Sequence, residues 1–211
     1  MKYDYKLFRR RNLPHLQPPD VPIFITYNLK FDLPEEIKEI IKQKRTIFKK
    51  NTNPSKSEII GFEKRIFELF DDFLVTYKHS PQWLAVTKIG DIIVESLHFL
   101  NNKYYKLLAF CIMSNHVHIL VKPLMDENSQ PFSLPKIMHD HKRFTARESN
   151  KILQRKGHFW QDENYDHYIR NDEEFYNVVW YIINNPVKAN LVKSWKEWKY
   201  TWVEDEVKRN L

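Results

Sequence analysis

The chain has 211 residues, of which 42% are hydrophobic and 15% aromatic, and only three are glycine. This composition is typical of a packed globular protein and excludes a disordered or low-complexity chain. Lys and Arg outnumber Asp and Glu by 34 to 27, so the formal charge is +7, and this excess favours a polyanionic partner, nucleic acid before a membrane surface.

Cys111 is the single cysteine, which excludes an intramolecular disulfide and a cysteine-based zinc cluster. The first residues lack the apolar run of a signal peptide, and no stretch reaches the ~20 apolar residues of a membrane span. We therefore expect a cytoplasmic protein without a membrane segment.

The first third of the chain predicts one strand and then helices. Arg9, Arg10 and Arg11 form a basic start that either touches phosphates or is simply solvated. The β-branched and aromatic run over 23–29 (IFITYNL) predicts the first strand. Apolar residues at helical spacing then predict helices over about 35–50 and 58–78, and a third around 92–100.

The rest of the chain predicts a hairpin followed by mixed elements. Strands over 104–113 and 116–122 are joined by Ser114 and Asn115, a short connection typical of a hairpin. A helix follows over 134–153, with Ile137, Met138, Phe144 and Ile152 expected to face inward. An extended segment over 165–170 precedes a helix over 175–185 that Pro186 is expected to stop.

This order of elements predicts an α+β fold in which helices cover one face of an antiparallel sheet. We expect a single domain over 1–211, with a helical insertion at about 35–100 after the first strand. An aromatic tail over about 190–211 is expected to pack back on the body.

The run over 110–123 (FCIMSNHVHILVKP) carries the first candidate site. Side chains alternate along a strand, so His116 and His118 point to one face while Val117 and Ile119 point to the other. Two imidazoles on one strand face make half of a site for a divalent ion. The alternative is a half-buried strand with two hydrogen-bonded core histidines.

A second candidate pair lies on the helix over 175–185. Tyr181 and Asn185 are four residues apart and therefore share a helix face. One interpretation is a tyrosine nucleophile beside a metal ion held by His116, His118 and Asn185. A phenol has a pKa of ~10 and is a weak nucleophile at neutral pH, and a metal ion that polarises the phosphoryl oxygen offsets this weakness. The other is a tyrosine at the edge of the core, followed by an asparagine at a helix end.

Three blocks, MSNHVHILVKP, HFWQDENYDHYIRNDEEF and WYIINNPVKANLV, together resemble the REP-associated tyrosine transposases, which are single-tyrosine HUH nucleases. The resemblance extends roughly from Arg9 to Trp202. It implies a ferredoxin-like fold with the histidine strand central in the sheet. It also implies cleavage and rejoining of single-stranded DNA at hairpin repeats through a covalent 5′-phosphotyrosine, with Mg²⁺ or Mn²⁺ as the required cofactor.

The resemblance assigns His116 and His118 to the metal motif, Asn185 to the third ligand and Tyr181 to the nucleophile. Tyr165 and Tyr168 are alternative nucleophiles, and Tyr181 is preferred because Asn185, one helical turn on, would be its metal-ligand partner. Ser114 stands where many members of the family have proline. The family contains monomers and homodimers, and both stay open for this chain.

DNA is expected to contact a basic helix face and nearby residues through phosphate contacts and base stacking. The candidates are Lys136, Lys142, Arg143, Arg147, His158, Trp160, Arg170 and Lys188. A core position is the alternative for Trp160. Two other functions compete with the transposase or endonuclease: a domesticated nucleic-acid-binding protein without turnover, and a structural or metal-binding α+β protein.

Overall fold

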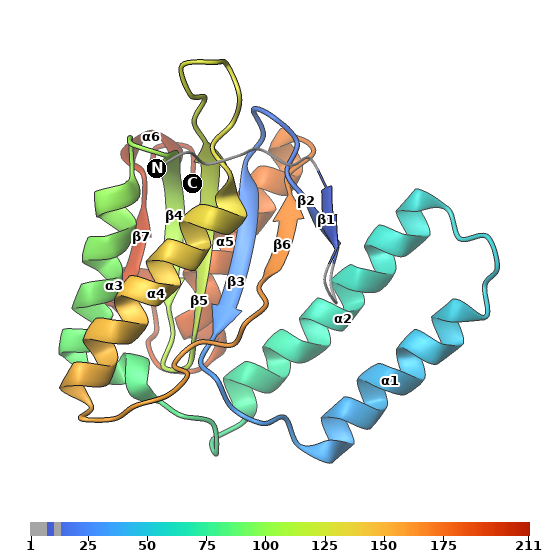
Figure 1. The fold of residues 1–211 in the computed structure, drawn as a ribbon, viewed down its shortest axis with the longest axis horizontal. Coiled ribbons are helices and arrows are strands. Elements are labelled where there is room, and N and C mark those ends of the chain that lie inside the picture. The colour runs from blue at the N-terminus through green and yellow to red at the C-terminus, as the bar shows by residue number, and fades with distance from the viewer. Residues whose placement is uncertain (1–7, 11–13) are drawn as a thin grey trace. The chain divides into compact units, whose positions relative to one another are not determined.

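The structure, a computed structural model, describes residues 8–10 and 14–211, which form two compact units (Figure 1). The first unit is Met1–Lys30 with Pro81–Leu211, and the second is Phe31–Ser80. Arg11 lies outside the described residues, whereas Arg9 and Arg10 lie in a short strand over 8–10 that precedes another over 14–16. Across the described part of the chain, no helix is long and apolar enough to span a membrane.

The first unit is built on an antiparallel sheet of five strands in the order β6-β3-β5-β4-β7. A separate two-stranded sheet pairs β1 with β2. The bounds are β1 Phe8–Arg10, β2 Pro14–Leu16, β3 Ile23–Asn28, β4 Tyr105–Ile112, β5 His116–Pro123, β6 Tyr165–Tyr168 and β7 Thr201–Val203. The hairpin strand β5 is central, and its burial on both faces explains its almost continuous apolar sequence.

Helices cover both faces of this sheet. α3 (Thr87–Leu100) and α4 (Leu134–Ile152) lie in front of it in Figure 1, and α5 (Asp172–Lys188) lies behind it. The front core joins Ile25 and Ile119 of the sheet to Ile93 of α3 and Ile137 of α4. The α+β class and the antiparallel sheet are confirmed, whereas the expected placement of the helices on one face is not, because α5 also buries an apolar stripe against the sheet.

A buried polar link connects both front helices to the sheet. His141 of α4 is bonded through Nε2 to the Tyr27 hydroxyl on β3, at 2.8 Å, and through Nδ1 to Ser96 Oγ on α3, also at 2.8 Å. Burial lowers the pKa of His141 to about 3, so its imidazole is neutral and can donate from one nitrogen and accept at the other.

The second unit is a hairpin of two helices, α1 (Glu35–Lys49) and α2 (Lys56–Thr76). Phe48 stacks on Phe62 with 4.1 Å between ring centroids. Arg45 forms an ion pair with Glu63 at 3.2 Å. No residue of α1 is buried. These helices confirm the helical insertion expected after the strand that begins at Ile23, and α3 belongs to the sheet unit instead.

Two sequence expectations differ from the structure. α5 continues through Pro186 to Lys188, because a proline in the last turn removes only one hydrogen bond near an end that already has unpaired groups. Phe144 is 45% exposed instead of facing inward, because α4 presents Ile137, His141 and Thr145 to the core.

The aromatic tail packs on the body, as expected. Its strand β7 pairs with the edge of β4, and the Trp198 indole N–H donates to the carbonyl of Ile112 at 2.9 Å. Tyr200 lies flat against α3 at Gly90, where a Cβ atom would stand 2.5 Å from the tyrosine ring. The short elements η1 (Trp83–Ala85), η2 (Trp195–Glu197) and α6 (Asp205–Lys208) complete the unit.

Candidate active site

The two histidines of β5 lie buried at the centre of the sheet. Both are 0% exposed, and their ring centroids are 4.8 Å apart. Because side chains alternate along a strand, they share the face that α5 covers, while Val117 and Ile119 enter the front core. The strand geometry expected from the spacing is therefore present.

Each imidazole is held by a hydrogen bond at Nδ1. Thr26 lies opposite His118 in the register of β3 and β5, and its Oγ1 is 2.7 Å from His118 Nδ1. Asn115 Oδ1 lies 2.6 Å from His116 Nδ1 and accepts a hydrogen bond from its N–H group. Because outer partners of this kind fix ring orientation and tautomer, a metal ion at this pair would bind through the Nε2 atoms.

α5 brings Tyr181 to the same face of the sheet. The Tyr181 ring is 5.5 Å from the His118 ring and 5.9 Å from the Phe24 ring, measured between centroids. Lys188, two turns further along α5, places its ammonium 5.9 Å from the centre of the Tyr181 ring. A half-buried phenol thus lies beside one of the two histidines and near an exposed cation.

Asn185 follows Tyr181 by one turn of α5 and is 1% exposed. Among the residues that the structure describes, neither atom of its amide has a hydrogen-bond partner. An unpaired buried amide costs roughly 1–3 kcal/mol, so this position calls for a ligand. Two imidazoles hydrogen-bonded at Nδ1, together with an amide oxygen, form a donor set that fits a divalent cation.

The alternative tyrosines lie on different faces of the sheet. In the register of β3 and β6, Tyr165 is opposite Thr26, and its ring contacts Phe24 at 6.2 Å on the Tyr181 side. Tyr168 is opposite Ile23 and packs against the front core. Only Tyr165 therefore shares a face with the histidine pair.

The N-terminus of α5 is fixed by Glu174. Its carboxylate accepts hydrogen bonds from Arg170 Nη2 at 2.6 Å, from the Arg170 backbone N–H at 2.8 Å and from His167 Nε2 at 2.8 Å. Burial would raise the pKa of Glu174, but these bonds outweigh it and lower the pKa to about 2. Arg170, a candidate for DNA contact, is thus engaged within the protein.

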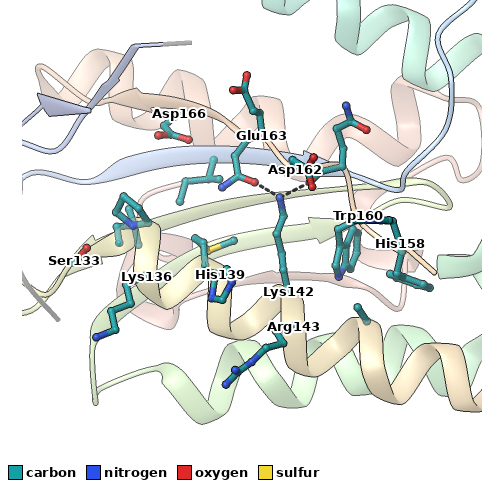
Figure 2. A pocket seen from close by; sticks show the side chains of 18 of the residues that line it. Ser133, Lys136, His139, Lys142, Arg143, His158, Trp160, Asp162, Glu163 and Asp166 are labelled. Carbon is teal, nitrogen blue, oxygen red and sulfur yellow. Dashed lines mark hydrogen bonds between the residues drawn. The ribbon is translucent and has the colours of Figure 1, made fainter. Parts of the chain in front are cut away.

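The basic residues of α4 lie on the opposite face of the sheet from Tyr181. Arg143 and Arg147 are exposed and form ion pairs with Asp140 at 3.8 Å and with Glu148 at 2.7 Å. Lys142 instead points inward and donates to the carbonyl of Gln161 at 2.8 Å and to the side chain of Asn164 (Figure 2).

The remaining candidates on the α4 side differ in exposure. Lys136 lies at the start of α4 and His158 is exposed in the loop that precedes β6. Trp160 is 5% exposed, donates its indole N–H to Thr145 Oγ1 at 2.9 Å and contacts the Tyr27 ring. Trp160 is therefore a core residue, and no base could stack on it.

Sequence reasoning did not identify Thr26 and Asn115. Asn115 could have been found, because it directly precedes the histidine motif and amide side chains commonly fix an imidazole. Thr26 depends on the register between β3 and β5, which joins residues 92 positions apart and is not visible in local sequence.

Comparison with known proteins identifies relatives of this chain. A protein of Haemophilus influenzae that carries the name REP-associated tyrosine transposase is 30% identical over 115 residues, which are 51% of this chain and 64% of that protein. The chain therefore spans less than two thirds of this relative's length. A solved structure of a REP-associated tyrosine transposase bound to a REP hairpin shares the fold, with a TM-score of 0.55 at 16% identity, over 96% of this chain and 88% of the other.

One family model also matches, and it covers residues 76–185, just over half of the chain. The matched segment contains both histidines of β5, and also Tyr181 and Asn185. The chain therefore belongs to the family described as IS200-like transposases.

Proposed function

We propose that this protein is a metal-dependent transposase or endonuclease that cleaves and rejoins single-stranded DNA at hairpin repeats, with Tyr181 as the nucleophile. The observation that carries the proposal is the position of the Tyr181 ring, 5.5 Å from the ring of His118. Membership in a transposase family supports DNA as the substrate. The hairpin held by the solved neighbour supports hairpin repeats as the target.

Cleavage would proceed by transfer of a phosphoryl group to Tyr181. The phenolic oxygen forms a bond to the scissile phosphorus and its proton passes to solvent, while the bond from phosphorus to the 3′-oxygen breaks. The leaving oxygen takes up a proton and becomes a free 3′-hydroxyl, and the 5′-phosphate stays on Tyr181. Attack by a 3′-hydroxyl reverses these steps and rejoins DNA without a nucleotide cofactor.

His116, His118 and Asn185 would hold a divalent ion, Mg²⁺ or Mn²⁺. Such an ion supplies polarisation of a phosphoryl oxygen, which offsets the weak nucleophilicity of a phenol. The chain's own contribution is to fix the two imidazoles through Thr26 and Asn115 and to hold Tyr181 beside them on α5.

The proposed DNA contacts fall on both faces of the sheet. On the Tyr181 face, the Lys188 ammonium would contact phosphates next to the scissile bond. On the other face, Lys136, Arg143, Arg147 and His158 would contact the backbone of the hairpin. We leave out Trp160 because it is buried, and we give Arg170 a structural role because Glu174 holds it.

The test is formation of a covalent adduct that survives denaturation. Labelled single-stranded hairpins from repeats next to the gene are mixed with the protein, with and without Mn²⁺, and resolved on a denaturing gel. Tyr181→Phe should abolish the adduct and leave hairpin affinity within about twofold, because it removes one hydroxyl. Tyr165→Phe is the matched control on the same face and should retain the adduct.

His118→Ala completes the series and should remove the metal dependence together with the adduct. An adduct that persists in Tyr181→Phe and disappears in Tyr165→Phe would overturn the nucleophile assignment. Hairpin binding without an adduct under any condition would instead support the binding protein without turnover.

A further inference from the structure

One side of α1 carries a line of side chains that stay exposed. α1 and α2 form a hairpin (Figure 1), and α1 turns Arg45 and Phe48 towards α2. At 3.6 residues per turn, positions 36, 40, 43, 47 and 50 lie together on a different side of the helix. Lys50 directly follows α1 and keeps helical backbone angles, so it continues this line. The line, called the α1 stripe here, consists of five exposed residues: Glu36, Ile40, Gln43, Ile47 and Lys50.

Two isoleucines form the apolar part of the α1 stripe. Ile40 is 40% exposed and Ile47 is 67% exposed, and α1 contains no buried residue. The two side chains lie two turns apart, about 10 Å along the helix axis. A helix of 15 residues is marginally stable in water without packing, so burial of this second apolar line would stabilise α1.

The charges of α1 are separated along its length. Residues 35–41 contain three Glu and one Lys, a net charge of −2, whereas residues 42–50 contain four Lys and one Arg, a net charge of +5. Glu36 and Lys50 mark the two ends of the stripe in the same order. Among the residues that the structure describes, neither of these two side chains has an ion-pair partner.

Reversal of the helix direction makes the α1 stripe complementary to itself. When two copies of α1 lie antiparallel around a two-fold axis beside Gln43, Glu36 of each copy meets Lys50 of the other. The same register brings Ile40 of each copy against Ile47 of the other, because both pairs are centred on residue 43 to within half a residue. A parallel arrangement would instead place like charges together at both ends. The antiparallel arrangement also sets the N-terminus of each helix dipole beside the C-terminus of the other.

We propose that the α1 stripe is the interface of a homodimer in which two copies of this chain pack antiparallel. The interface is isologous, so every contact occurs twice, and no element is exchanged between the copies. One helix from each copy gives a contact at the low end of the size range of specific interfaces, so the dimer should be weak and depend on concentration. The inference does not depend on the proposed function, and each copy would bring its own candidate active site to the dimer.

The first experiment is sedimentation velocity of the full chain without DNA, from roughly 2 to 200 μM, the range in which a weak dimer dissociates. The parent chain should shift with concentration from 25.8 kDa towards twice that mass. Ile47→Lys should weaken association about tenfold or more, because it places a charge in the apolar centre of the contact. Met125→Lys is the matched control: it adds the same charge at a residue that is 42% exposed in the loop after β5, and it should associate like the parent.

The second experiment exchanges the charges at the ends of the stripe. Glu36→Lys and Lys50→Glu should each weaken their own homodimer about tenfold, because each dimer then contains two like-charged pairs. A mixture of the two variants should associate as well as the parent chain, because every end contact again joins a lysine to a glutamate. Fluorescence-detected sedimentation of labelled Glu36→Lys with an excess of unlabelled Lys50→Glu measures this recovery. Recovery requires that both variants fold.

The outcomes test both the interface and its direction. A parent chain that stays monomeric at the highest concentration would overturn the proposal. A dimer of unchanged strength in Ile47→Lys would place the interface elsewhere. Two weakened charge variants that fail to associate in the mixture would overturn the antiparallel register. None of these measurements contains DNA, so a failure of the covalent-adduct assay leaves them unaffected.

Discussion

The hydroxyl of Thr26 on β3 lies within hydrogen-bonding distance of a ring nitrogen of His118. It lies 2.7 Å from Nδ1 and holds the imidazole from the neighbouring strand. We therefore expect it to affect metal binding through the orientation and the basicity of the His118 ring. Thr26→Val should weaken Mn²⁺ binding about 10–100-fold with little change of side-chain volume. Isothermal titration calorimetry of the purified protein measures this directly, without DNA.

Thr26→Ser retains the hydroxyl and should bind Mn²⁺ within a fewfold of the parent chain. If Thr26→Val binds the ion as tightly as Thr26→Ser, the bond to His118 has no role in the metal site. If both lose binding, the cause is packing around residue 26 and not the hydroxyl.

At the residue scale, local sequence was enough to find the side chains that share a face. Alternation along β5 brings His116 and His118 together, and the four-residue spacing on α5 does the same for Tyr181 and Asn185. The direction of Lys142 could not be read in this way. The exposed side of α4 depends on which residues of the sheet and of the 157–166 loop pack against it, and those contacts are long-range.

At the element scale, the placement of α5 depends on Glu174. The Glu174 carboxyl has its pKa lowered to about 2 from an ordinary value of 4.5, so it stabilises the fold above about pH 4.5. This contribution is lost as the pH falls from 4.5 towards 2, because the unfolded chain takes up the proton first. Glu174→Gln should cost roughly 1–3 kcal/mol at pH 7, and the difference should shrink over that acidic range.

Thermal unfolding of both chains between pH 7 and pH 3 checks this expectation. Glu173→Gln is the matched control, because Glu173 lies in the same first turn of α5 but is exposed. A difference between parent and Glu174→Gln that stays constant as the pH falls would show that the carboxylate is not the stabilising group.

The long helices and the central hairpin were predictable because each has its own periodicity or turn signal. Short elements were predictable only in part: the extended segment expected over 165–170 contains β6, whereas β7 has three residues and exists because it pairs with β4. The end of α5 was predicted wrongly because a proline rule that holds inside a helix was applied to its last turn.

At the scale of the whole molecule, the positive charge is unevenly distributed. Residues 40–57, around the tip of the α1–α2 hairpin, contain six Lys and Arg and no Asp or Glu. Lys44, Lys49 and Lys50 are exposed, and the described part of the chain gives them no ion pair. Cations without an acidic partner can neutralise DNA phosphates, and this releases the counterions that are condensed on the DNA.

Replacing Lys44, Lys49 and Lys50 with Gln should therefore weaken DNA binding at low salt and flatten its dependence on salt. The slope of log affinity against log salt should fall by up to about 2, at roughly 0.7 per phosphate contact on a single strand. Anisotropy titrations at several salt concentrations measure it, with Lys193, Lys196 and Lys208 changed to Gln as the charge-matched control. Equal slopes for the two triple variants would exclude the tip from the DNA path.

The overall architecture was only partly predictable. The class of fold follows from the order of elements, but strand order and the use of both sheet faces do not. The second face is apparent only when α5, with Val179 and Ile182 buried, is docked behind the sheet. Sequence periodicity shows that a helix has an apolar stripe, and it does not show which surface that stripe will meet.

Tyr181 and the basic residues of α4 lie on opposite faces of the five-stranded sheet, which has a consequence for the length of DNA that reaches both. A strand held at both places would have to turn around an edge of the sheet. The thickness of the protein layer would then set the shortest length of DNA that can engage both faces, whatever its sequence.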